Sequence, residues 1–431
     1  MSHLSRITLR QAFTQPAALT LFFFGFTSGL PFLLVGGTLS AWLKESGVSL
    51  EHIGLVSLAG LAYSFKFLWA PAVDRLRLPF LGRLGQRRGW LLAAQLLLAT
   101  SLLLMAWITP QGSFALFIAM TALAAFAGAT QDVVVDAYRI EIAPVEAQGA
   151  LAATYTLGYR IALLASGAFA LVLADHVAWS LVYLCMAAAV GAVMLATLLA
   201  REPQQAAVRS ASVTSVLEDS VIGPFRDFFR RYSGALGIAL LAFMGLFKIS
   251  DQMIGVMALP FYLDCGFSKS EIGAVSKIFG VWVGIAGAFL GAAVIVRLGV
   301  QRSLLVAMLL GAASNLLFLL LAQFPGDIRV FTAVIGGENL VGGFLGTAAV
   351  AWLSSLVSRH YTATQYALFS SLVALPGKLV GGFSGFVVTA TGYTAFFVFS
   401  TLAILPALVL FFWLQPQLKG KDHDDAGNPA G

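Results

Sequence analysis

The chain has 431 residues, of which 59% are hydrophobic and only 11% are charged. Its mean hydropathy is +0.88. A soluble domain carries about 25% charged residues, so the composition excludes a water-soluble protein, and with it the secreted, nuclear and DNA-binding classes. It indicates a polytopic membrane protein. The formal charge is +6, and the positions of the basic residues along the chain explain this charge without a nucleic-acid partner.

Twelve stretches are long and apolar enough to cross the hydrocarbon core of a bilayer, which takes about 20 mostly apolar residues. Their unbroken hydrophobicity predicts helices, because the strands of a membrane barrel alternate between apolar and polar residues. The predicted spans are approximately 17–41, 52–74, 89–109, 114–138, 151–174, 178–200, 234–259, 271–296, 303–323, 330–356, 363–388 and 393–415. The first run is longer than the apolar core of a signal peptide, so we expect a retained span.

The basic residues set the orientation of the spans. Of the 26 Lys and Arg residues, 18 fall in segments that are cytoplasmic if the N-terminus is inside, and only Lys44, Lys269 and Arg329 fall in outer loops. We therefore expect both termini in the cytoplasm. The longest internal loop, residues 201–233, separates a six-helix half at 1–200 from another at 234–418. The charged tail, residues 419–431, is predicted to be disordered.

The two halves contain similar segments in the same order. Ser49-Leu-Glu-His-Ile-Gly-Leu-Val-Ser57 opens the second span, and Ser268-Lys-Ser-Glu-Ile-Gly-Ala-Val-Ser276 opens the eighth. Arg160 in span five and Lys378 in span eleven correspond at nearly the same offset. Six-helix halves that repeat in parallel orientation indicate an all-α major facilitator fold, with a substrate site between the halves near mid-membrane.

Nine ionisable residues lie within the predicted spans, where a charge is costly unless it faces a partner or a wet cavity. Arg160 and Lys378 lie near the middle of their spans, and we expect these repeat-related cations to bind an anionic substrate from opposite halves. Lys66 is placed similarly, and Tyr63, one turn earlier, could stack on a sugar ring. The alternative is that an acid on a neighbouring helix neutralises each cation.

The acidic residues within the spans are candidates for proton coupling. Asp132 is the better candidate, because an ionised carboxylate inside the membrane is costly. Gln131 beside it could hydrogen-bond a substrate. Glu338, followed by Asn339 in the outer half of span ten, is the second choice.

Other charged residues favour structural roles. Asp136 lies near the cytoplasmic edge, four residues after Asp132, and is expected to pair with Arg139 or with the loop Arg75–Arg88. Such pairs would close the cytoplasmic side, so the predicted gate consists of Asp74, Arg75, Arg88, Asp136 and Arg139. Lys248 and Asp251 are three residues apart on span seven and are expected to satisfy each other.

The first half resembles a known family through a specific combination of motifs. These are Gly25-Phe-Thr-Ser-Gly29-Leu-Pro31, Gly37-Thr-Leu-Ser-Ala-Trp42, Tyr63-Ser-Phe-Lys66-Phe-Leu-Trp69-Ala-Pro71-Ala-Val-Asp74-Arg75, Arg87-Arg-Gly-Trp90, Thr130-Gln-Asp132-Val-Val-Val-Asp136-Ala and Leu157-Gly-Tyr-Arg160. Together they are similar to the AmpG muropeptide permeases over about residues 20–175. The second half matches more loosely, and the chain stops at twelve spans where several family members carry more.

This resemblance implies a proton-driven importer of anhydro-muropeptides in the bacterial inner membrane. Such import would serve peptidoglycan recycling and, where that signalling exists, β-lactamase induction, which bears on antibiotic resistance. The substrate would be an anionic glycopeptide, in agreement with the cations in the spans. We expect the substrate-binding residues to be Gly29, Tyr63, Lys66, Gln131, Tyr159, Arg160, Asn339 and Lys378.

Two alternatives remain open from the residues. Similar branches of the superfamily move siderophores or acetyl-coenzyme A, so the alternative cargo is a siderophore or another large organic anion. A membrane-embedded enzyme or sensor is disfavoured, because the chain has no paired nucleophile and base in one membrane plane. It also has no GxxxxGK[ST] motif for ATP hydrolysis and only two cysteines. We expect a monomer with no metal and no cofactor, whose partners are substrate, protons and the lipid bilayer.

Overall fold

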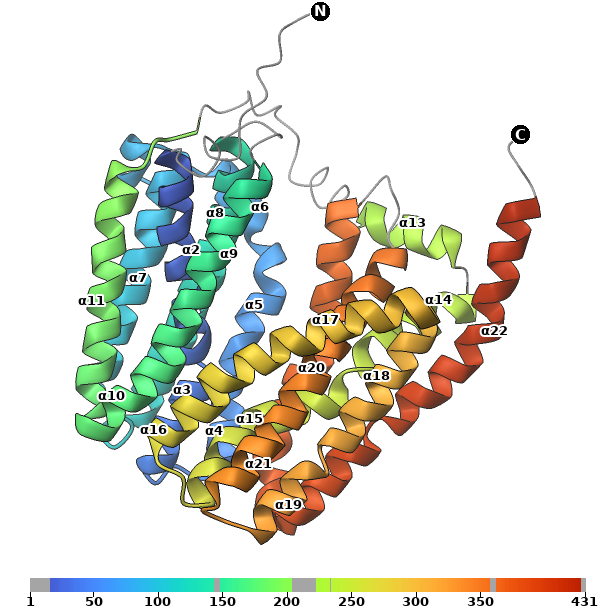
Figure 1. The fold of residues 1–431 in the computed structure, drawn as a ribbon. Helices are drawn as coiled ribbons and strands as arrows, with labels where there is room; N and C mark the ends of the chain where they lie inside the picture. Colours follow the sequence, from blue (N-terminus) through green and yellow to red (C-terminus); the bar gives the residue numbers. More distant parts are fainter. Residues whose placement is uncertain (1–15, 143–147, 204–221, 233, 357–361, 428–431) are drawn as a thin grey trace, which may run out of the picture. The chain divides into compact units, whose positions relative to one another are not determined.

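A computed structural model describes residues 16–142, 148–203, 222–232, 234–356 and 362–427 (Figure 1). These residues form helices joined by short turns, and no strand occurs among them. The predicted all-α fold is confirmed. Most of the predicted linker, residues 201–233, and the last residues of the tail lie outside the described ranges.

The chain packs as two compact units. Unit 1 comprises Met1–Ser49, Val56–Ala211 and Ser268–Lys277, and unit 2 comprises Leu50–Leu55, Ser212–Phe267 and Ile278–Gly431. The division resembles the two predicted halves, but two short segments are exchanged: Leu50–Leu55 packs in unit 2, and Ser268–Lys277 packs in unit 1. The bounds 1–200 and 234–418 for the halves stay a prediction.

The helices of unit 1 come mostly from the first half of the chain. They are α2 (Pro16–Leu34), α3 (Gly37–Glu45), η1 (Leu58–Leu61), α5 (Ala62–Phe65), η2 (Lys66–Leu68), α6 (Ala70–Arg75), η3 (Leu81–Leu84), α7 (Gln86–Ile108), α8 (Phe114–Ile142), α9 (Gln148–Leu164), η5 (Ala165–Phe169), α10 (Ala170–His176), α11 (Trp179–Leu199) and α16 (Lys269–Ile272). Two elements cross between the units: α4 (Leu50–Ser57) and η7 (Gly273–Phe279).

The helices of unit 2 follow from the second half. They are α13 (Gly223–Arg231), α14 (Gly234–Leu246), α15 (Ile249–Asp264), α17 (Gly280–Leu298), α18 (Val300–Ser314), α19 (Leu317–Gln323), α20 (Ile328–Leu356), α21 (Thr362–Leu402) and α22 (Leu405–Gly427). Helix α22 extends to Gly427 and so continues through most of the tail that composition predicts to be disordered.

Ten helices among the described residues are long and apolar enough to cross a membrane. Two features make this number consistent with the twelve predicted spans. The second span is divided into α4, η1, α5, η2 and α6, so no part of it is a long regular helix. The last two spans form one run that is interrupted at Gly392, where φ is +78°.

Close helix contacts in unit 1 depend on glycine. Helices α2 and α9 cross so tightly that a Cβ atom at Gly29 would lie 2.6 Å from the carbonyl oxygen of Tyr159. A Cβ at Gly25 or Gly158 would overlap the backbone of the facing helix at Tyr155 or Phe22. Small residues allow this approach in a membrane, where van der Waals packing replaces the hydrophobic effect. The crossing places the Tyr155–Tyr159 turn of α9 beside the middle of α2, which borders the candidate site.

Candidate functional site

The centre of the candidate site in unit 1 is an ion pair between two predicted spans. Lys66 Nζ lies 3.8 Å from Asp132 Oδ2, and the exposed fractions of the two side chains are 34% and 13%. Asp132 projects from the regular helix α8, whereas Lys66 begins the short 3₁₀ segment η2. Irregular helical segments often mark functional positions. The alternative raised from the sequence, that an acid on a neighbouring helix pairs with Lys66, is therefore observed in this structure.

Polar groups around the pair are only partly satisfied. Gln131 donates from Nε2 to the Ser28 hydroxyl at 3.4 Å. Within the described part of the chain, Gln131 Oε1 and Asp132 Oδ1 are buried without a hydrogen-bond partner. Buried polar atoms are nearly always partnered, so these two acceptors favour a site that is completed by a donor from a substrate, a proton or water.

Three tyrosine side chains lie within electrostatic range of the same carboxylate. Tyr63, Tyr155 and Tyr159 each interact electrostatically with Asp132. Gly128 makes room for the Tyr63 hydroxyl, because a Cβ atom at Gly128 would overlap it. The site thus combines a carboxylate, an ammonium group, an amide and phenolic hydroxyls. This set can bind an anionic, hydroxyl-rich ligand and carry a proton.

Not every predicted substrate-binding residue of unit 1 lies in this cluster. Gly29 is buried, and its observed contact is with α9. Arg160 is exposed on α9, next to Tyr159 in the chain. Within the described residues it forms no ion pair. The substrate-binding roles of both residues stay predictions.

Unit 2 contains the remaining candidates. Asn339 donates from Nδ2 to Glu338 Oε2 at 2.7 Å and to the Ile335 carbonyl at 3.0 Å. Lys378 is partly buried on α21. Because Arg160 belongs to unit 1 and Lys378 to unit 2, their joint contribution to a substrate site stays a prediction.

The prediction for span seven is confirmed. Lys248 Nζ lies 3.9 Å from Asp251 Oδ2, three residues further along. This pair lies on one stretch of chain, so its spacing alone was sufficient to predict it.

Two of the predicted gate residues, Asp74 and Arg88, lie in a charged cluster at the start of α7. Asp74 Oδ1 accepts from Arg87 Nη1 at 2.7 Å, and Glu141 accepts from Arg87 Nε at 2.9 Å and from Nη2 at 2.5 Å. Arg139 Nη2 pairs with Asp136 Oδ1 at 3.8 Å, which is one of the two predicted partnerships. The side chain of Arg75 lies outside the described ones. A gating role for any of these residues stays a prediction.

Glu202 caps the start of α7, and Arg88 of α7 caps the end of α11. The Glu202 carboxylate accepts the backbone N–H groups of Arg87 and Arg88 at 2.8 and 3.0 Å, which satisfies unpaired donors at the start of α7. The Arg88 guanidinium donates from Nε to the Thr197 carbonyl at 3.2 Å and also contacts the Leu198 carbonyl, at the end of α11. The predicted gate residue Arg88 thus joins α7 to α11.

The predicted gate included neither Arg87, although it belongs to the loop Arg75–Arg88 and to one of the family motifs, nor Glu141 and Glu202. Signals existed for the two acids: Glu141 follows Arg139 at the end of span four, and Glu202 follows Arg201 directly after span six. Acids beside arginines at the ends of spans are candidates for capping and pairing. Which arginine they would reach depends on helix packing, and the sequence does not contain that information directly.

Comparisons with known proteins agree with this architecture. Residues 18–262 match the Major Facilitator Superfamily. The anhydromuropeptide permease of Escherichia coli is 39% identical over 400 residues, which cover 92% of this chain and 79% of that protein. The transporter named AmpG 4 of Rickettsia conorii is 34% identical over 402 residues, which cover 92% of this chain and 96% of that protein.

Solved transporter structures share the fold. The nucleoside transporter NupG has a TM-score of 0.67 at 17% identity, over 94% of this chain and 100% of that chain. A D-xylose-proton symporter has a TM-score of 0.66 at 14% identity, over 94% of this chain and 97% of that chain. At these identities the likeness concerns the fold alone.

Proposed function

The chain belongs to the major facilitator superfamily and, within it, to the family of the anhydromuropeptide permeases, and from this premise we propose that it imports anhydromuropeptides in symport with protons. It is a multi-pass membrane protein and a transporter rather than an enzyme. The observation that carries the substrate is the 39% identity to an anhydromuropeptide permease along 92% of the chain. We further propose a monomer in the bacterial inner membrane, with both termini in the cytoplasm.

Asp132 is the proposed proton carrier. It lies inside a predicted span, its pairing distance to Lys66 is at the long end for an ion pair, and its second oxygen is buried without a partner among the described residues. The Ser28 hydroxyl also interacts with this carboxylate, but because the contact with Lys66 is long, the carboxylate can exchange its lysine for a proton. Protonation of Asp132 would release Lys66 to bind a carboxylate of the substrate, which couples the two binding events.

The remaining polar groups fit the chemistry of a glycopeptide. Gln131, Tyr63 and Tyr159 supply an amide and two phenols close to Asp132, which suit sugar hydroxyl and N-acetyl groups. Arg160 and Lys378 would add cations for the peptide carboxylates. Glu338 is the proposed second proton site in unit 2, and Asn339 beside it is proposed to bind substrate.

Uptake of radiolabelled anhydromuropeptide into proteoliposomes, under an imposed inward proton gradient, tests the proposal. We expect accumulation that a protonophore abolishes. Absence of uptake by folded protein would overturn the proposed cargo. Uptake that a protonophore leaves unchanged would overturn proton coupling, but the proposed cargo would stand.

The variant Asp132→Asn isolates the coupling step. We expect it to lose gradient-driven accumulation while it still exchanges labelled for unlabelled substrate, since the amide cannot release a proton. Asp251→Asn is the matched control, because it removes an acid within a predicted span that pairs on its own stretch of chain, and it should still accumulate substrate. Full gradient-driven accumulation by Asp132→Asn would exclude Asp132 as the coupling residue.

A further inference from the structure

One helix of this protein belongs to both packing units. The helix Lys269–Leu298 is continuous, yet its residues up to Lys277 pack in unit 1 and those from Ile278 pack in unit 2. The change of unit falls inside the π-helical segment η7. On the other side, Phe267 stacks on Phe331 of unit 2 with ring centroids 4.4 Å apart, and Gly266 turns the chain with φ +87°. The segment Ser268–Lys277 is therefore bounded by a glycine turn and by an irregular helical turn.

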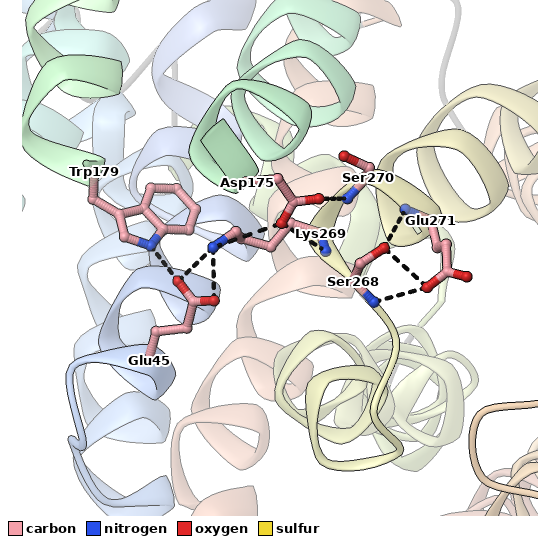
Figure 2. Close-up of polar contacts among 7 residues, drawn as sticks. All are labelled: Glu45, Asp175, Trp179, Ser268, Lys269, Ser270 and Glu271. Carbon is pink, nitrogen blue, oxygen red and sulfur yellow. Dashed lines mark hydrogen bonds and ion pairs between the residues drawn. The ribbon is translucent and has the colours of Figure 1, made fainter. Parts of the chain in front are cut away.

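A charge cluster fixes the beginning of this segment on unit 1 (Figure 2). Lys269 Nζ donates to both oxygens of Glu45, at 2.8 and 3.0 Å, and lies 3.7 Å from Asp175 Oδ1. The Asp175 carboxylate also accepts the backbone N–H groups of Lys269 at 3.3 Å and Ser270 at 2.6 Å. One ammonium group thus joins the end of α3 to the end of α10.

Trp179 completes the cluster from a third helix. Its indole N–H donates to Glu45 Oε2 at 2.6 Å, and Lys269 Nζ lies 5.7 Å from the centroid of its ring. The Trp179 ring is stacked on Trp42, with centroids 6.1 Å apart. The exposed fraction of the Lys269 side chain is 12%. Because it is shielded and has several partners, this cluster is stronger than an ordinary surface ion pair.

The rest of the segment lies on small residues of unit 1. Ile272 is completely buried. A Cβ atom at Gly273 would lie 3.1 Å from the carbonyl oxygen of Ala168. Further along, the Lys277 side chain passes Gly167, where an added Cβ would lie 3.5 Å from its Cγ atom. Beyond the lysine cluster, the segment is therefore held by the buried Ile272 side chain and by close contacts at Gly167 and Gly273.

The repeat-related segment Leu50–Leu55 is seated in a different way. It packs in unit 2, where a Cβ atom at Gly54 would lie 2.5 Å from the Gly382 carbonyl oxygen, and one at Gly385 would overlap the Leu50 backbone. The exchange is thus reciprocal between the repeats. The seat of the second span includes close backbone contacts at glycine, and the seat of the eighth span includes the Lys269 charge cluster.

We infer that Lys269, Glu45 and Asp175 form a releasable latch that holds the start of the eighth span on unit 1 during one stage of the transport cycle. Transporters of this fold work by movement of one repeat against the other. Because the helix continues into unit 2, such movement must detach its first turns or bend it at η7. The latch sets the free-energy difference between seated and detached states. The inference rests on the proposed function only because it calls this cycle a transport cycle.

The test uses a buried reporter and needs no substrate. In a Cys185→Ser, Cys265→Ser background, Ile272→Cys places a thiol at the buried contact, and the rate of its modification by N-ethylmaleimide is measured in detergent. We expect Lys269→Gln to raise this rate about fivefold to tenfold, because detached states become more populated. Lys269→Arg keeps the charge and should stay within about twofold of the reporter parent. Arg329→Gln removes an exposed cation elsewhere, and its modification rate should also stay within about twofold of the reporter parent.

Salt and a second variant give independent readouts. Raising the ionic strength from 0.1 to 1 M, which shortens the Debye length from about 10 to 3 Å, should accelerate modification of the parent but not of Lys269→Gln. Glu45→Gln should act in the same direction as Lys269→Gln, which covers the case in which one variant fails to fold. Equal rates for the parent and both charge-removing variants at low salt would overturn the latch. Failure of substrate uptake would instead refute the proposed function and leave this result intact.

Discussion

Replacing Arg87 with glutamine tests whether the ion cluster at the start of α7 holds unit 1 together. The Arg87 guanidinium makes two hydrogen bonds to Glu141 and one to Asp74, and the exposed fraction of its side chain is 9%. Glutamine is too short to reach both acids and carries no charge. The variant therefore leaves two carboxylates facing each other across the position that the guanidinium occupied.

The exposure of the two acids sets the expected magnitude. Removing one partner of a fully buried ion pair costs about 3–5 kcal/mol, chiefly because an uncompensated charge remains. Here the exposed fractions of the Glu141 and Asp74 side chains are 29% and 52%, so water stabilises the remaining charges in part. We expect a loss of about 2–3 kcal/mol in the free energy of unfolding, below the range for full burial. For a unit of this size, that corresponds to a fall of about 4–12 °C in Tm.

Thermal unfolding of the detergent-solubilised protein, followed by intrinsic fluorescence, measures the effect. Arg83→Gln is the matched control, since Arg83 is exposed and lies four residues away, and it should leave Tm unchanged. Adding Glu141→Gln to Arg87→Gln should recover at least about 1 kcal/mol relative to additivity, because it removes one stranded charge. A Tm within about 2 °C of wild type for Arg87→Gln would refute the reasoning.

Two glycine substitutions test close approaches in unit 1 by the same assay. Gly85→Ala should lower Tm more than Gly47→Ala, because Gly85 has backbone angles (φ +119°, ψ +164°) that essentially only glycine adopts and its Cβ atom would also overlap the Glu202 carboxylate that caps α7. Equal losses would contradict both the strain at Gly85 and the close approach of Glu202. Gly158→Ala should lower Tm by several degrees because its Cβ would enter the α2 backbone at Phe22, whereas Gly191→Ala, with open space, should be neutral or slightly stabilising. A neutral Gly158→Ala would contradict the tight crossing of α2 and α9.

Continuous hydrophobicity and the internal repeat were sufficient to predict the all-helical fold and its family. Both signals are local: a span is visible in about 20 consecutive residues, and Ser49–Ser57 can be compared directly with Ser268–Ser276. The pair Lys248–Asp251 was predictable for the same reason, since three residues separate the two groups, although Lys248 lies in the turn that caps α15 and not within a helix. The partner of Lys66 was not predictable from spacing, because Asp132 comes from another helix.

The irregular features of the fold were also beyond prediction from hydrophobicity. Span two contains Gly60 and Pro71, yet its apolar run gives no sign that it divides into short α and 3₁₀ pieces. The placement of Ser268–Lys277 in unit 1 depends on tertiary contacts with Glu45 and Asp175, far away in the chain. The repeat showed that the two exchanged segments are related. It did not show that each of them packs in the unit formed mostly by the other half of the chain.

Three charged sites in unit 1, at Arg87, Lys269 and Lys66, differ in how completely their charged groups are hydrogen-bonded. Arg87 uses three guanidinium nitrogens on two acids, and Lys269 reaches both oxygens of Glu45 while Asp175 is held by backbone N–H groups. Such saturated clusters resist rearrangement until an element moves as a whole. The pair Lys66–Asp132 is different, because its atoms are 3.8 Å apart and one carboxylate oxygen is buried without a partner among the described residues. A charge held by a long contact can exchange its partner for a proton or a substrate without first separating helices, and for this reason we propose proton coupling at Asp132 and conformational control at the Lys269 cluster.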